Sequence, residues 1–356
     1  MQSILLKNGR IWDGEEFFNT DVFIDRGKIV KIADGISEKA DFTEDVSGKI
    51  VTAGLVDMHT HLRGISSDSI GAQAEISCFP FGVTCAADAE GAKGDKDFLN
   101  RLTVKTRVFA GVPIEKNKPR LDLAQKKLAE YGEKAVGLKV FFDNRTSEVW
   151  NAEPLYAVCI FALENNLKVM VHSTNSPVPM ADIVNTLHRG CIISHIFHGG
   201  SNNAADDGFK SLLKAKEKGV ILDLGLEGFV HTDFKLLKEA FNYGIFPDTV
   251  STDITKVSMY TRGGKYGLTM CMSLARNAGM SEADVFRAVT STPAKVLGME
   301  NGCGYIKEGA TADIAVIEET LEAKYKLTDM FGNAVSSKKG YQCLLTVSSG
   351  EIVYRR

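Results

Sequence analysis

Residues 51–64, VTAGLVDMHTHLRG, combine the pattern of a buried strand with the first candidate metal ligands in the chain. The stretch begins with apolar residues, as a strand buried on both faces does. It then presents His59 and His61, two residues apart. Side chains at i and i+2 of a strand point to one face, so these two imidazoles can hold one divalent metal ion. On the same alternation, Asp57 and Arg63 share that face.

Length and composition narrow the class of protein. The 356 residues allow one large domain, or one large and one small domain, and 44% hydrophobic with 24% charged residues is ordinary for a globular chain. A net charge of −3 gives no electrostatic case for nucleic acid or an anionic membrane. There is no apolar run of membrane-spanning length and no signal-peptide pattern at the start. Seven cysteines without a CxxC pair indicate reduced thiols, so we expect a cytoplasmic protein.

Both ends of the chain are predicted to be rich in β-strands. The predicted strands cover residues 3–10, 21–25 and 28–33 at the head and 312–317, 343–347 and 351–355 at the tail. The pairs 21–25 with 28–33 and 343–347 with 351–355 have hairpin patterns. Neither end alone has enough strands for a stable core. We therefore expect residues 1–50 and 303–356 to form one small β-sandwich domain.

Between these ends, residues 51–302 alternate short apolar strands with amphipathic helices. The predicted strands are 54–59, 82–87, 106–112, 135–141, 168–172, 191–195, 219–224 and 249–253. The predicted helices are 120–134, 154–166, 180–189, 207–218, 232–243, 265–278 and 282–297, the last capped by Ser281. This alternation predicts a (β/α)8 TIM-like barrel. A doubly wound open sheet is the alternative, but no GxGxxG loop opens the first helix.

Ionisable residues fall at the ends of the predicted barrel strands, where the catalytic mouth of such a barrel lies. One strand-end histidine alone is more often a hydrogen-bonded core residue than a ligand. Several such residues aimed at one mouth are hard to explain by packing. The set comprises His59 and His61 on the first strand, Lys139 on the fourth, His172 on the fifth, His195 on the sixth and Asp253 on the eighth.

Lys139 stands in an otherwise apolar strand, AVGLKVFF. A buried lysine is costly unless it is paired or neutral, and burial favours the neutral, nucleophilic amine. Such an amine can take up carbon dioxide and become a carbamate, whose two oxygens can bridge two cations. The alternative is a lysine that extends to the rim of the barrel. Spacing alone leaves both open.

The order HxH, Lys, His, His, Asp on strands one, four, five, six and eight resembles the amidohydrolase superfamily. Within it, the chain looks most like dihydroorotase-like metallohydrolases, including deacetylases and acetyl-hydroxy-acid esterases. The resemblance implies that His59, His61 and Asp253 hold the more buried of two divalent ions, and that His172 and His195 hold the other. It also implies that carboxylated Lys139 and a hydroxide bridge the two ions, and that the protein is a homo-oligomer. Zinc is the expected metal, although manganese, iron and cobalt accept similar ligands.

Other candidates lie near the predicted mouth. Asp253 is the expected catalytic proton carrier as well as a ligand. Arg63 is a candidate for binding a substrate carboxylate, as dihydroorotases use an arginine at this place, or else a salt-bridge residue on the rim. His198, Tyr260 and Arg262 are further substrate-binding candidates. His188 and His231 are expected to be helix-end residues without a role, and Asp57 to support the metal ligands.

Three functions are compatible with these residues. The first is a two-metal hydrolase acting on an amide, cyclic amide or ester bond of a small carboxylate-bearing molecule. The second is a mononuclear aminohydrolase of the adenine-deaminase kind. Those enzymes typically lack the strand-four lysine and carry HxxE, whereas this chain reads STNS after His172. The third is a non-enzymatic scaffold, which the complete ligand set argues against.

Overall fold

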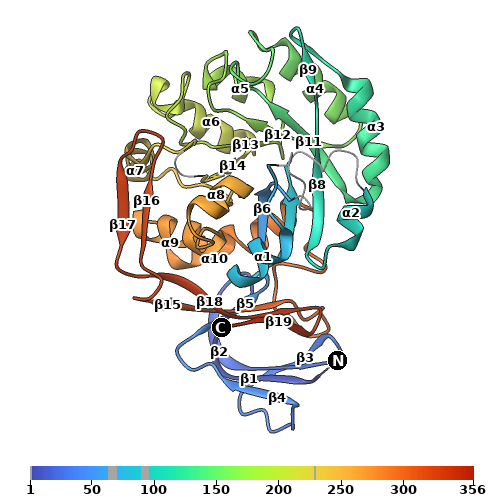
Figure 1. Cartoon of the computed structure of the whole chain (residues 1–356), viewed down its shortest axis with the longest axis vertical. Helices are drawn as coiled ribbons and strands as arrows, with labels where there is room; N and C mark the ends of the chain where they lie inside the picture. The colour runs from blue at the N-terminus through green and yellow to red at the C-terminus, as the bar shows by residue number, and fades with distance from the viewer. Residues whose placement is uncertain (1, 63–69, 90–95, 228–229) are drawn as a thin grey trace.

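The computed structural model describes residues 2–62, 70–89, 96–227 and 230–356. A barrel of parallel strands with helices around it forms the larger part of the molecule, and a sheet built from both ends of the chain lies below it (Figure 1). The α/β class and the barrel predicted from the sequence are confirmed. The division at residues 1–50, 51–302 and 303–356 stays a prediction.

Seven parallel strands form the wall of the barrel in chain order. They are β6 (Leu55–Thr60), β7 (Val83–Asp88), β8 (Lys105–Gly111), β11 (Ala135–Phe141), β12 (Lys168–His172), β13 (Ile192–Ser194) and β14 (Ile221–Asp223). The predicted eighth strand, residues 249–253, makes only single bridges, from Thr249 to Asp223 and from Ile254 to Thr60. Asp253 has φ +52°, so the backbone leaves the extended region there and regular pairing ends. The segment still closes the ring between β14 and β6.

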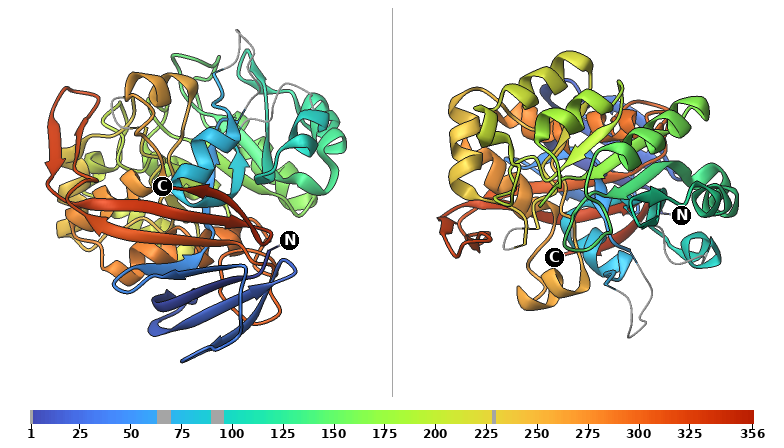
Figure 2. Two further views of the ribbon diagram at one scale, coloured as in Figure 1. Left: turned by 60° about the horizontal axis from the view of Figure 1, so that its bottom comes forward. Right: turned by 90° about the horizontal axis from the view of Figure 1, so that it is seen from above.

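Helices cover the outside of the barrel (Figure 2). They are α1 (Ala74–Cys78), α2 (Lys96–Arg101), α3 (Leu121–Tyr131), α4 (Glu153–Glu164), α5 (Met180–Thr186), α6 (Lys210–Lys218), α7 (Phe234–Asn242), α8 (Lys256–Thr261), α9 (Leu268–Ala278), α10 (Glu282–Ala288) and α11 (Ser291–Val296). The single helix predicted for 282–297 is wrong, because the chain breaks it into α10 and α11. The restart puts Pro293 in the first turn of α11, where its missing N–H needs no partner. The predicted cap is confirmed, since Ser281 Oγ accepts from the Asp284 N–H.

Alternate residues of the barrel strands face two different cores. Val56, Phe109 and Met170 belong to a core inside the barrel, whereas their neighbours Leu55 and Val108 pack under the helices. Continuous burial along these strands follows from having apolar layers on both faces. The inside positions at the upper ends of the same strands carry the ionisable residues.

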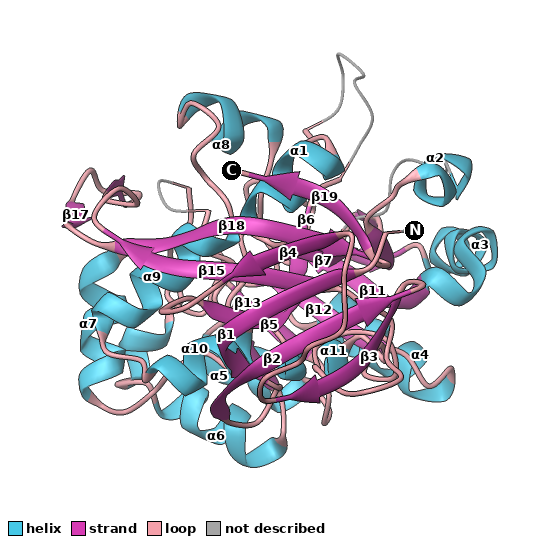
Figure 3. Cartoon of the chain, turned by 90° about the horizontal axis from the view of Figure 1, so that it is seen from below, coloured by secondary structure: helices cyan, strands magenta, loops and turns pink. Residues whose placement is uncertain are grey.

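The terminal sheet has strands from both ends of the chain. Its order is β19 (Glu351–Arg355), β18 (Gly340–Ser348), β15 (Ile314–Thr320), β5 (Ile50–Ala53), β1 (Ile4–Trp12), β2 (Phe17–Asp25) and β3 (Lys28–Ala33), with β4 (Phe42–Asp45) beside β1. Both predicted hairpins are confirmed. Apolar side chains from the two halves, such as Val22 and Leu345, share one core. Seen from below, this sheet crosses the bottom of the barrel (Figure 3).

Two short hairpins were not predicted. One joins β9 (Ile114–Glu115) to β10 (Lys118–Pro119) beside the barrel mouth. The other joins β16 (Tyr325–Thr328) to β17 (Ala334–Ser337), between β15 and β18 of the terminal sheet. This second hairpin leaves the terminal sheet and reaches the neighbourhood of α7 (Figure 1). Its tip thereby comes within reach of the loops at the mouth.

The structure corrects the expectation that all seven cysteines are reduced thiols. Cys85 on β7 and Cys303 form a disulfide, although they lie 218 positions apart in the sequence. Such a separation leaves no local pattern by which the pair can be found. The other five cysteines are free and buried. Within the described residues, no helix is long and apolar enough to cross a membrane.

Candidate active site

The first strand of the barrel brings two histidines into the mouth through an irregularity. The pairing of β6 with β7 shifts register between Asp57 and Thr60. His59 and His61 are both buried, at 0% and 5% exposure. Asp57 does not share their site as the alternation predicted: its carboxylate accepts bonds from the Thr252 N–H and Oγ1, at 3.2 and 2.7 Å. Burial raises the pKa of Asp57 to about 7, although these hydrogen bonds lower it. Asp57 thus holds the residue that precedes Asp253.

His59 is oriented from behind by a buried carboxylate. Its Nδ1 lies 3.0 Å from Asp223 Oδ2 on β14. Asp223 in turn accepts from Thr249 Oγ1 and Ser251 Oγ, at 2.8 and 2.7 Å. The Nε2 of His59 therefore faces the centre of the barrel. This arrangement, a carboxylate behind a histidine, is common around metal-binding histidines.

His195 is held in the same way by a backbone carbonyl. Its φ is +60°, and its Nδ1 lies 2.8 Å from the Gly225 carbonyl oxygen. A Cβ at Gly225 would stand 2.7 Å from His195 Nδ1, so a glycine is required for this close approach. The imidazole nitrogen left over, Nε2, points to the centre. Within the described chain it has no hydrogen-bond partner.

His172 and His195 lie side by side, with ring centroids 4.7 Å apart. Burial lowers the pKa of His172 and of His195 well below the usual value, and the neighbouring His231 lowers both further. Burial also lowers the pKa of His59, with Lys139 adding to the effect. Neutral imidazole is the form of histidine that binds metal ions. The cluster therefore holds its histidines ready for ligation.

Asp253 lies among these rings. Its Oδ1 is 3.0 Å from His61 Nε2 and 3.2 Å from His59 Nε2. Burial raises the pKa of Asp253, but His59 and His61 outweigh that effect and hold the pKa below its usual value. The backbone N–H of Asp253 donates to the His59 carbonyl at 2.8 Å, which ties the eighth segment to the first strand. Asp253 is thus an ionised carboxylate at the centre of the mouth.

Lys139 is fully buried on β11, and its Nζ lies 3.0 Å from His59 Nε2. It does not extend to the barrel rim. The Phe141 ring, 5.5 Å from Nζ, covers one side. The amine therefore faces the histidines directly.

These residues fit a metal centre. Two groups each bring three donor atoms within 4.8 Å of one another: one is His59, His61 and Asp253, and the other is His172, His195 and His231. In the described part of the chain, His172 Nε2 and His195 Nε2 are buried without a hydrogen-bond partner. Buried polar atoms are rarely left so, and metal ions would satisfy them. All six ligands predicted from the sequence lie in this one cluster.

The structure places the predicted substrate-binding residues in different surroundings. Arg63 lies outside the described residues. His198 is fully buried in the loop after β13. Tyr260 is 69% exposed. Arg262 is half-buried, and its guanidinium lies 4.2 Å from the centre of the Tyr266 ring.

Three residues at the site were missed by sequence reasoning. Asp223 had a detectable signal, namely an acidic residue in the apolar strand VILDL. Glu227 and His231 come from the loop after β14, whose path no local pattern gives. Glu227 is 3% exposed, and burial raises its pKa to about 8, with Asp253 adding to the effect. His231 was expected to be a helix-end residue without a role, but its ring lies against those of His172 and His195.

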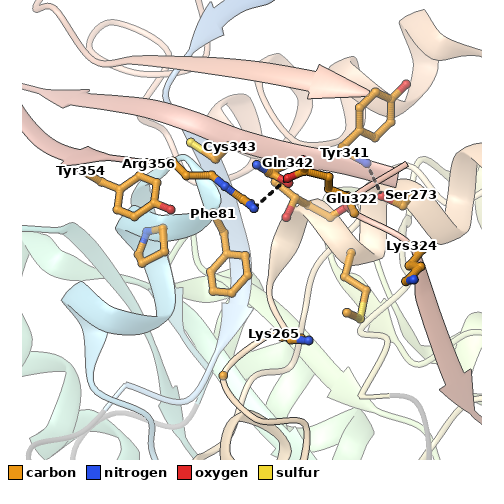
Figure 4. Close-up of a pocket in the computed structure, with 15 residues that line it drawn as sticks. Phe81, Lys265, Ser273, Glu322, Lys324, Tyr341, Gln342, Cys343, Tyr354 and Arg356 are labelled. Atoms are coloured by element: carbon orange, nitrogen blue, oxygen red, sulfur yellow. Dashed lines mark hydrogen bonds and ion pairs between the residues drawn. The ribbon is translucent and has the colours of Figure 1, made fainter. Parts of the chain in front are cut away.

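Two of the pockets lined by described residues bear on where the site opens. The first, about 360 Å³, lies between α9 and the end strands β18 and β19, and its wall includes Lys265, Glu322 and Arg356 (Figure 4). It contains none of the cluster residues. The second, about 520 Å³, is lined by Val112, Ile114 and Phe141 among others. Because the Phe141 ring lies 5.6 Å from the His172 ring, the second pocket adjoins the cluster and the first does not.

Comparison with known proteins identifies the family. The protein-family model described as "Amidohydrolase family" matches residues 50–353 of this chain. The chain belongs to the amidohydrolase family. A deacetylase of Enterococcus faecalis is 27% identical over 98% of this chain and 98% of its own. A 5-methylthioadenosine/S-adenosylhomocysteine deaminase of Thermococcus kodakarensis is 24% identical over 99% of this chain and 94% of its own.

The fold agrees with solved structures. A crystal structure of a dihydroorotase superposes with a TM-score of 0.87 at 24% identity, covering 99% of this chain and 98% of that one. Amidohydrolases typically bind metal ions, and the two histidine groups described above are suited to that. The protein is therefore a hydrolase of the amidohydrolase family, and its fold is that of a dihydroorotase.

Proposed function

We propose that this amidohydrolase uses two divalent ions and a hydroxide between them to cleave an amide, cyclic amide or ester bond in a small carboxylate-bearing substrate. The observation that carries the proposal is that one barrel mouth brings together Lys139 and five further predicted ligands: His59, His61, His172, His195 and Asp253. Bound divalent ions would supply Lewis acidity, which makes water nucleophilic near neutral pH and polarises a carbonyl. Zinc is the ion that this donor set favours.

Each side chain has a part in this proposal. His59, His61 and Asp253 would hold one ion, and His172 and His195 the other. A carboxylated Lys139 would stand between them, since its Nζ already faces the histidines. Asp253, kept ionised by its surroundings, would take the proton of the attacking water and pass it to the leaving nitrogen or oxygen. Burial of the cluster keeps other water away and strengthens these interactions.

The class of substrate rests on the sequence. Arg63 follows His61 by two residues, and a guanidinium binds a carboxylate with two parallel hydrogen bonds. A carboxylate held there would bring a neighbouring acyl carbonyl towards the cluster. The resemblance to a deacetylase supports acyl compounds, such as N-acyl amino acids or acetylated hydroxy acids. His198, Tyr260 and Arg262 stay candidates for further substrate contacts. We also propose a homo-oligomer, from the resemblance, and a cytoplasmic location, from the five cysteines that are free.

A mononuclear aminohydrolase is the second candidate, supported by the likeness to the Thermococcus deaminase. It predicts one tightly bound ion and activity on a neutral purine. A non-enzymatic scaffold predicts no bound ion and no hydrolysis of any compound. A panel of N-acyl amino acids, hydantoin-like rings, acetylated hydroxy acids and purines, assayed with metal-loaded enzyme, separates the three.

The matched test of the acidic substrate uses an acyl acid and its methyl ester. Arg63→Met should raise KM for the acid by about 10-fold or more, because a bidentate ion pair is lost, and should leave the ester almost unchanged. Arg26→Met, at an exposed position of the terminal sheet, is the control and should leave KM unchanged for both compounds. Equal losses for acid and ester in Arg63→Met would mean that Arg63 is structural and that the acidic-substrate proposal is wrong.

A further inference from the structure

His231 occupies a position in the cluster that the two-ion arrangement proposed above leaves without a part. It lies in the loop between β14 and α7, and its side chain is 13% exposed. The imidazole stacks on the His195 ring at 4.1 Å, with 27° between their planes. It also meets the His172 ring edge-on at 4.9 Å. Two imidazoles from strand ends and one from the loop after β14 therefore share one corner of the mouth.

The ring of His231 is oriented as metal-binding histidines are. Its Nδ1 lies 3.0 Å from Thr174 Oγ1, which leaves Nε2 as the inward nitrogen. Nε2 faces the centre, 3.5 Å from Asp253 Oδ2. His59 and His195 show the same pattern, with Nδ1 bonded to Asp223 and to a backbone carbonyl. A partner behind one ring nitrogen fixes which nitrogen is presented to an ion.

The backbone around His231 is anchored from two sides. The His231 carbonyl accepts from the Gly199 N–H at 3.2 Å, and Thr232 Oγ1 donates to the Leu226 carbonyl at 2.6 Å. The tip of the β16–β17 hairpin adds a third tie, since the Met330 N–H donates to the Thr232 carbonyl at 3.1 Å. A loop fixed in this manner delivers its side chain to one place, as a ligand position requires.

We propose that His231 is a ligand of the second divalent ion, together with His172 and His195. This rests on the proposed two-ion function and adds a third imidazole to that ion. The three donor nitrogens lie within 4.8 Å of one another, which is compatible with a single ion at their centre. Three neutral imidazoles favour a borderline divalent ion such as zinc or cobalt over calcium or magnesium.

The test measures metal retention rather than activity. Purified wild-type and His231→Gln proteins, both loaded with zinc, are dialysed against graded chelator, and zinc per chain is read by elemental analysis. Wild type should hold two ions. His231→Gln should lose one of them at a chelator concentration about 10-fold or more lower, because a ligand is missing. A cobalt-loaded sample should show a matching change in its visible absorption.

The matched control is His188→Gln. His188 is also a histidine beyond a barrel helix, but its Nδ1 faces the Arg189 carbonyl and it lies outside the cluster. It should retain both ions as wild type does. Thr174→Val keeps the imidazole of His231 and removes the partner of Nδ1, so it should lower retention of the same ion to a smaller extent. If His231→Gln fails to fold, metal retention in Thr174→Val tests the proposal instead.

The outcomes separate the two proposals. Two ions in wild type with an unchanged chelator midpoint in His231→Gln would overturn the ligand assignment alone, even if turnover fell. Fewer than two ions in wild type would contradict the proposed two-metal function, and the assignment of His231 with it. Loss of one ion in His231→Gln but not in His188→Gln supports both.

Discussion

At the scale of single residues, the site depends on partners that stand behind the imidazoles. His59 presents Nε2 to the centre because Asp223 binds its Nδ1, and His195 does so because of the Gly225 carbonyl. Lys139 reaches the same centre from β11. Each of these contacts joins residues far apart in the sequence. The geometry of the site is therefore a property of the closed barrel.

Lys139→Ala should lose bound metal and activity together, because it removes the amine that would carry the bridging carbamate. Metal per chain and turnover are measured on the same sample. A short-chain carboxylate added to the variant should restore part of both. Lys134→Met is the control, since that lysine donates to the Leu99 carbonyl outside the cluster. If Lys139→Ala keeps two ions and a normal rate, the bridging role is wrong.

Asp253→Asn should lower kcat by about 100-fold or more, the usual contribution of a positioned acid–base group. The variant suits the backbone, because asparagine tolerates the φ of +52° at this position. Asp233→Asn is a matched control, since asparagine can replace aspartate as the cap of α7. Steady-state kinetics on metal-loaded proteins gives the answer. Wild-type turnover in Asp253→Asn would remove this carboxylate from the chemistry.

The sequence allowed the six proposed ligands to be predicted because each is a polar residue inside or at the end of an apolar strand. The alternation of barrel strands then brings them to one mouth. Asp57 does not share the face of His59 and His61, because the register shift in β6 leaves no mark in the sequence, but its bonds to Thr252 agree with the expected supporting position. His231 and Glu227 were missed because a loop path depends on distant contacts, such as that between Thr232 and Met330. Arg63 is not tested by the structure.

At the scale of elements, the β16–β17 hairpin links the terminal sheet to the active-site loops. Its tip is organised by Asp329, which is 2% exposed. This carboxylate accepts from the Phe331 N–H and from both the backbone and the side chain of Asn333, at 2.8–3.0 Å. It also accepts from the Phe234 N–H at the start of α7, at 3.2 Å. One side chain thus supports the hairpin and the helix after the His231 loop.

Asp329→Ala should destabilise the protein by about 1–3 kcal/mol, because it leaves several N–H groups without their acceptor. Urea unfolding at pH 7 measures the change. The exposed Asp206, replaced by alanine, should change stability by less than about 0.5 kcal/mol. Equal stability of wild type and Asp329→Ala would show that the tip does not anchor the loops.

The stability difference between wild type and Asp329→Ala should depend on pH. Burial raises the pKa of Asp329, but the hydrogen bonds from Asn333 and its neighbours outweigh it and leave the pKa lowered. The stabilisation is therefore complete above the unfolded-state pKa of about 4 and is lost as the pH falls through the folded value. The difference between wild type and Asp329→Ala should shrink in that acidic range. A constant difference would contradict this role of the charge.

Element boundaries followed the sequence where caps and apolar runs were clear. The long predicted helix after Ser281 was wrong because Pro293 favours a restart. The eighth strand was predicted in the right place but is too irregular to count as one, since Asp253 leaves the extended conformation. The β16–β17 hairpin has a turn signal in Gly332-Asn333 that was not used in the prediction. It is held by contacts with the barrel, which a local pattern cannot show.

At the scale of the whole molecule, the two ends of the chain meet in one sheet beneath the barrel (Figure 3). That meeting was predictable from the shortage of strands at each end. The strand order, with β5 between β1 and β15, was not. The sheet also supplies the hairpin that reaches the mouth. The terminal part of the chain therefore supports the active site as well as closing the lower end of the barrel.

A metal titration of the whole enzyme tests the two-metal centre. The protein is stripped with chelator, checked by elemental analysis and returned to activity with zinc, while hydrolysis of an N-acyl amino acid or acetylated hydroxy acid identified by the substrate panel is followed. We predict no turnover without metal and full turnover at two ions per chain. Full activity in metal-free protein, or full activity at one ion per chain, would contradict the two-metal centre.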